Sequence, residues 1–80
     1  MTSKEILETR INIASIIKVP PDNVRFMYAK GYSKPYWFFS EDEKYNTILF
    51  FSEKPLDFEI IEEIKYMEEV AKEWDEEDII

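Results

Sequence analysis

Apolar residues near the start of the chain recur at the spacing of a helix. This pattern predicts a helix over residues 3–19, with Ile6, Ile13 and Ile17 as apolar positions and Arg10 at the same helical spacing. Thr2 and Glu5 form the sequence signature of a capping box at the helix start, and Pro20 and Pro21 end the pattern. Further isoleucines widen the apolar band to more than half of the helix circumference. We therefore expect this helix to contact the sheet on one side and a second helix or another subunit on the other.

Three segments in the middle of the chain have the composition of strands. Residues 23–29, 36–40 and 46–52 are rich in aromatic and β-branched side chains and are separated by turn-prone stretches. Gly31, in the first connection, is free to adopt a positive φ. The short connections predict a three-stranded antiparallel meander. Consecutive apolar residues in the second and third strands indicate either burial on both faces or one face left for a partner.

The last third of the chain holds the longest element. An apolar stripe predicts a helix over residues 57–76 with Asp57 as its N-cap. The stripe consists of Ile60, Ile64, Met67, Ala71 and Trp74. The element order α-β-β-β-α predicts one α+β domain over residues 1–80, in which a three-stranded antiparallel sheet packs against two helices. This order is compatible with both helices on one face of the sheet.

Acidic residues concentrate in the last element. The whole chain has 18 acidic and 10 basic residues and a net charge of −8. Residues 1–54 hold 7 acidic and 8 basic residues, whereas residues 55–80 hold 11 acidic and 2 basic ones. Helical spacing predicts an outward acidic ridge on the last helix, followed by a cluster of acids at its end. The candidate partner-binding residues are Glu59, Glu62, Glu69, Glu73, Asp75, Glu76 and Glu77.

Three interpretations of this ridge stay open. Acidic surface helices keep small proteins soluble. Carboxylates in a row can also stand in for backbone phosphates in the basic groove of a nucleic-acid-binding protein. In the third interpretation the ridge recognises a specific protein that has no relation to nucleic acid.

Aromatic residues gather around the first predicted turn. Seven of them fall within residues 28–45, interleaved with Lys30, Lys34 and Lys44. Many can be explained as core, but Tyr32, Tyr36 and Trp37 near the turn predict a protein-binding patch. The same mixture of rings and lysines is typical of platforms that stack single-stranded bases. The net negative charge disfavours nucleic acid as the partner.

Arg10 lies near the centre of the apolar band of the first helix. A guanidinium there requires a partner or must extend to solvent. We expect a structural ion pair with an acid of the last helix, such as Glu68 or Asp57.

Composition excludes several kinds of site. Without cysteine or histidine the chain has no thiolate nucleophile and no imidazole ligand, and its single glycine excludes glycine-rich phosphate loops. The acidic runs at 41–43 and 75–78 lack the spacing of a calcium loop. We therefore expect no enzyme activity, no cofactor and no metal. No apolar run approaches a membrane span, so we expect no membrane partner and a cytoplasmic location, in the host cytoplasm if the protein is viral.

These features together predict a small acidic protein that binds another macromolecule. The favoured hypothesis is an inhibitor or nucleic-acid-mimicking decoy, of the type that phages and mobile elements use, which engages a basic surface such as that of a nucleic-acid-binding protein. The alternative is a homodimeric structural or adaptor protein without such mimicry. A single-strand nucleic-acid binder that uses the aromatic hairpin is the third hypothesis.

Overall fold

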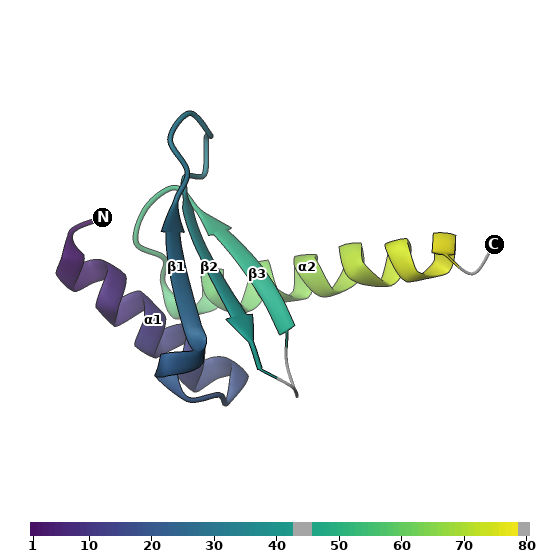
Figure 1. Ribbon diagram of the computed structural model, residues 1–80, viewed down its shortest axis with the longest axis horizontal. Helices are drawn as coiled ribbons and strands as arrows, with labels where there is room; N and C mark the ends of the chain where they lie inside the picture. Colours follow the sequence, from purple (N-terminus) through teal and green to yellow (C-terminus); the bar gives the residue numbers. More distant parts are fainter. Residues whose placement is uncertain (43–45, 79–80) are drawn as a thin grey trace.

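The computed structural model describes residues 1–42 and 46–78, with side chains described up to residue 73. Its elements are α1 (Ser3–Ile17), a 3-10 turn η1 (Pro21–Asn23), β1 (Val24–Tyr28), β2 (Tyr36–Glu41), β3 (Asn46–Phe51) and α2 (Asp57–Asp78). The strands form an antiparallel sheet in the order β1-β2-β3, with β2 in the middle. Figure 1 shows the sheet with α2 running behind it. The predicted fold class, α+β in the order α-β-β-β-α, is confirmed.

Both helices pack on the same face of the sheet, which we call the inner face. Phe38 of β2 is paired with Phe26 and Leu49 there. The buried core joins inner-face residues to both helices, and its members are Ile13, Ala14, Val19, Val24, Phe38, Leu49, Phe51, Ile60 and Ile64. Since successive strand residues point to opposite faces, Trp37 and Phe39 lie on the other side, the outer face. The arrangement is a two-layer sandwich with one sheet face outside the core.

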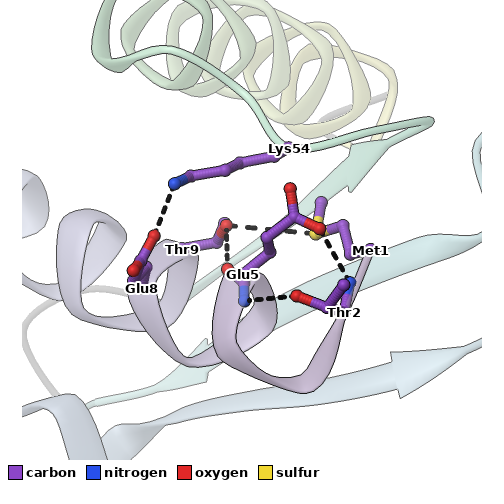
Figure 2. A network of polar contacts seen from close by, with 6 residues as sticks. All are labelled: Met1, Thr2, Glu5, Glu8, Thr9 and Lys54. Atoms are coloured by element: carbon purple, nitrogen blue, oxygen red, sulfur yellow. Dashed lines mark hydrogen bonds and ion pairs between the residues drawn. The ribbon is translucent and has the colours of Figure 1, made fainter.

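The start of α1 is fixed by a network of polar contacts (Figure 2). The Thr2 hydroxyl accepts from the Glu5 amide at 3.2 Å, and the Thr2 amide donates to the Glu5 carboxylate at 2.9 Å. The predicted capping box is therefore present. The hydrogen bond from the Thr2 amide to the carboxylate, together with one from the Thr2 side chain, favours the charged form and lowers the pKa of Glu5. One turn further, Lys54 pairs with Glu8, which connects α1 to the segment that precedes α2.

The end of α1 differs from the prediction by two residues. Lys18 adopts a left-handed conformation with φ of 60°, and the Val19 amide donates to the Ala14 carbonyl at 3.0 Å. A left-handed residue after the last turn is a common helix stop, so the helix closes before Pro20 and Pro21 are reached. On the solvent side of α1, Leu7 and Ile11 are 53% and 46% exposed. The wide apolar band is thus only partly covered by the described chain.

Arg10 does not pair with an acid of α2, so the predicted ion pair with Glu68 or Asp57 is wrong. Its Nε donates to the Val24 carbonyl at 2.8 Å, and a terminal nitrogen lies 3.4 Å from the Pro21 carbonyl. The turn η1 brings these two carbonyls beside α1. Backbone acceptors therefore satisfy the guanidinium and tie α1 to the beginning of β1.

Among the described side chains of α2, those that pack on the core lie in its first half. Ile60 and Ile64 are 0% and 8% exposed, and Met67 packs against the core. Ala71, which the stripe places on the same face, is exposed. The reason is visible in Figure 1, where the distal turns of α2 continue past the edge strand β3. The Trp74 side chain lies outside the described residues.

We predict that Thr2→Ala lowers the free energy of unfolding by about 1 kcal/mol, because the Glu5 amide loses its acceptor. Urea unfolding followed by circular dichroism measures this change. Ser3→Ala, at the adjacent exposed position, is the control and should be near neutral. Equal effects of the two substitutions would mean that the capping box contributes nothing in solution.

The ion pair between Lys54 and Glu8 predicts a pH dependence of stability. The hydrogen bond from Lys54 lowers the pKa of Glu8 below its ordinary value of 4.5, and the same bond raises the pKa of Lys54 above 10.5. The contribution of Glu8 to folding stability is therefore present above pH 4.5 and is lost as the pH falls through the lowered pKa. The contribution of Lys54 to folding stability is lost only as the pH rises above 10.5.

Lys54→Gln should accordingly lose less stability than the parent chain when the pH is lowered from about 6 to about 3. The urea midpoint at each pH provides the measurement, with Lys65→Gln on the exposed side of α2 as the control. Parallel acid profiles for the parent and Lys54→Gln would contradict a contribution from this pair.

Candidate functional site

The acidic ridge lies on the exposed side of α2. Glu59, Glu62, Glu69 and Glu73 are all exposed, and Tyr66 stands among them at 61% exposure. The ridge residues Asp75, Glu76 and Glu77 belong to the last turns of α2, and their side chains are outside the described residues. The structure therefore brings the four described glutamates onto one side of one helix.

Glu59 also helps to begin the helix. Its carboxylate accepts from the Leu56 amide at 3.0 Å. Helix α2 begins at Asp57, so Asp57 is its first residue and not its N-cap as predicted. Leu56 has no side-chain acceptor for a cap, and Glu59 supplies the carboxylate half of a capping box. Among the described ridge residues, Glu62, Glu69 and Glu73 remain exposed and have no such structural role.

A further acid of α2 connects to the first hairpin. Glu63 lies 3.8 Å from Lys34, and the Glu63 side chain is only 15% exposed. The contact links Lys34, at the end of the loop between β1 and β2, to the proximal half of α2. It also joins the aromatic hairpin and the acidic helix into one surface.

The structure separates the three hairpin aromatics that the sequence groups together. Tyr36 lies on the inner side, with its ring 6.1 Å from Phe26 and 5.3 Å from Tyr28, and its hydroxyl accepts a hydrogen bond from the Met1 ammonium. Trp37 points to the outer face and contacts Tyr32, with ring centroids 5.2 Å apart. Adjacent strand residues face opposite sides. Tyr32 and Trp37 therefore share a surface, and Tyr36 does not.

Trp37 is held in place from two directions. Its indole Nε1 donates to the Lys34 carbonyl at 2.8 Å, and its ring meets Phe50 edge-on at 5.2 Å. Tyr32 completes the group at 63% exposure. These contacts fix a rigid aromatic cluster at the turn end of the outer face, with its outer side open to solvent.

The outer face carries an apolar surface, which is one of the two alternatives expected from the consecutive apolar residues of the second and third strands. Trp37 of β2 is paired with Met27 of β1 on one side and with Phe50 of β3 on the other. Phe39 of β2 is paired with Ile48 of β3. None of these side chains belongs to the core or packs against it. The signal was present in the sequence, because a strand with one wet face alternates apolar and polar residues, whereas 36–39 and 48–51 are apolar throughout.

A groove connects this surface to the middle of α2. It has a volume of about 640 Å³, and the outer face contributes Met27, Trp37, Phe39 and Ile48 to its lining. Helix α2 contributes Met67, Val70 and Ala71. A smaller groove of about 380 Å³ between β3 and α2 includes Lys34, Glu62 and Tyr66. The larger groove is therefore mainly apolar and borders the acidic helix.

Among the described side chains, those of residues 1–42 and 46–73, no three acidic groups cluster closely enough to hold a metal ion. In the same part of the chain, neither helix combines the length and apolar composition needed to cross a membrane.

Comparison with known proteins finds no family model, no curated protein and no solved structure that matches the chain. Its function must therefore be argued from the surfaces described above.

The geometry of the first hairpin loop predicts the effect of one substitution. Gly31 has φ of +96°, and an added Cβ would meet open space. The cost of Gly31→Ala is therefore backbone strain alone, about 1 kcal/mol. Urea unfolding should show this loss, while Ser33→Ala in the same loop should be near neutral. A neutral Gly31→Ala would show that the loop carrying Tyr32 has another conformation in solution.

Proposed function

We propose that this protein binds a basic surface of another protein through the acidic outer side of α2. The observation that carries the proposal is the charge density of that helix. Over residues 57–78 it has eleven acidic and two basic side chains, a net charge of −9 on 22 helical residues. At about 1.5 Å per residue the helix is about 33 Å long, or one net charge per about 3.7 Å. A nucleic-acid strand has one per about 3.4 Å.

The cost of this charge to the helix supports a role beyond solubility. Like charges at three- and four-residue spacing repel each other, and acids near a helix C-terminus oppose the macrodipole. The core offsets this cost only near Ile60 and Ile64. A basic partner surface would relieve the repulsion along the remaining turns and would gain rapid, salt-dependent association.

The matched charge density favours a decoy as the specific form of the activity. A basic groove that accepts a nucleic-acid strand would accept α2 in its place, and the protein would then inhibit by occupancy. No bond is made or broken in such an activity, so it needs neither catalytic residues nor a cofactor. On this proposal the protein acts in the cytoplasm, where a nucleic-acid-binding target would be reached.

A competition assay tests the proposal. A fluorescent single-stranded oligonucleotide is bound to an oligolysine peptide, and fluorescence anisotropy follows its release as the protein is added. We expect the parent chain to displace the oligonucleotide. Raising the salt from about 50 to about 200 mM should weaken the binding of the parent chain to the oligolysine peptide.

Two double variants with the same change in net charge distinguish binding by the acidic ridge from binding by the net charge of the whole protein. Glu69→Lys with Glu73→Lys should weaken competition about tenfold or more. Asp22→Lys with Glu53→Lys, at exposed positions outside α2, should retain most of it. Equal losses in the two variants would show that only net charge matters and would refute a binding role for the acidic ridge.

A further inference from the structure

The geometry points to a second contact with the partner: the groove between the outer face and α2 binds an amphipathic basic helix of another protein. Apolar side chains of that helix would fill the groove, and its lysines and arginines would face the acids of α2. The inference rests on the proposed function for the basic character of the partner. The apolar contact stands on separate observations.

The first observation is the exposure of a continuous apolar surface. Met27 is 46% exposed, and Trp37, Phe39, Ile48 and Phe50 of the outer face are each only half-buried. The register makes them neighbours across three strands. Contiguous apolar patches of this kind on a small protein are typical of interaction sites.

The second observation is the shape of the site. Residues 67–71 in the middle of α2 form one wall and the outer face forms the other, around an open groove of about 640 Å³. Pockets that bury a drug-sized ligand have about 300–1,000 Å³, so the groove has room for a few large side chains of a peptide. An amphipathic helix inserts such side chains at positions i, i+3, i+4 and i+7.

The side chains that line the groove suit a helical occupant. Met27 and Met67 lie on its two walls, and methionine adapts to different apolar partners because it is unbranched and polarisable. Trp37 between them is fixed by its hydrogen bond to Lys34. Tryptophan is one of the residue types enriched at binding hot spots.

The charges around the groove select a basic occupant. Glu41 and Glu68 belong to its lining, and α2 as a whole has a net charge of −9. Arg25, near this face, already lies 3.7 Å from Glu41. A second copy of the chain would bring another net charge of −8 to this surface. Charge complementarity therefore favours a basic helix over self-association.

The test uses Trp37 as a fluorescent reporter. The chain has two tryptophans, and Trp74→Phe leaves Trp37 as the only one. The probe is a synthetic 18-residue peptide of leucine and lysine with helical periodicity. Two control peptides are a scrambled version of the same composition and a periodic version with glutamine in place of lysine. We expect a saturable blue shift of Trp37 emission with the periodic lysine peptide and at least about tenfold weaker binding of both controls.

Matched neutral substitutions then locate the contact. Met27→Asn in the groove should weaken binding of the periodic lysine peptide about tenfold. Ile11→Asn on α1 replaces an apolar residue of the same 46% exposure and should leave binding unchanged. Ala71→Gln is a second groove variant and should also weaken binding. Ala71 is exposed on α2, and glutamine favours a helix. Circular dichroism confirms that each variant is folded.

The outcomes distinguish this inference from the proposed function. Equal, salt-sensitive binding of the periodic and scrambled lysine peptides without a Trp37 response would refute the groove and leave the acidic ridge intact. Equal, salt-insensitive binding of the lysine and glutamine peptides would retain the apolar groove but refute a basic occupant. A dimer seen by light scattering and abolished by Met27→Asn would assign the groove to a second copy. Quenching of Trp37 by oligothymidine alone would assign it to single-stranded nucleic acid, and either result would overturn the proposal.

Discussion

Burial of Phe38 between the two helices and the neighbouring strands decides which side of every strand faces water. Phe38 is 1% exposed and lies opposite Phe26 and Leu49. Because side chains alternate along a strand, fixing this residue inward sends Trp37 and Phe39 outward, and a register shift of one residue would exchange the two faces. Both helices cover the inner face, so the apolar residues on the outer face have no cover from the described chain. The candidate groove is a direct consequence of this one-sided packing.

Helix α2 serves two physical roles along its length. Its proximal turns contribute Ile60 and Ile64 to the core, and their burial fixes the direction of the helix. Its distal turns carry the acids past the sheet edge (Figure 1), where burial no longer offsets repulsion between carboxylates. The part of the helix that is least supported by packing is therefore the part that gains most from an oppositely charged partner.

Much of the fold could be predicted from the sequence because its signals are local. Helical periodicity, the Thr2–Glu5 capping box and the short connections between strands each depend on neighbouring residues. The partners of Arg10 could not be predicted, since they are backbone carbonyls that only the folded turn η1 brings close. The separation of Tyr36 from Trp37 follows from strand alternation, but the groove also requires the position of α2 relative to β3, which no local pattern contains.

The unequal distribution of charge gives the molecule a strong electric dipole. Residues 1–54, which form α1 and the sheet, have a net charge of +1, and the remaining negative charge lies on α2. The helix extends to one end of a molecule whose longest dimension is 44 Å (Figure 1). A dipole of this kind rotates in the field of a positively charged surface before contact is made. Near such a surface the protein would therefore arrive with the C-terminal turns of α2 leading, so that orientation is selected during diffusion and not after collision.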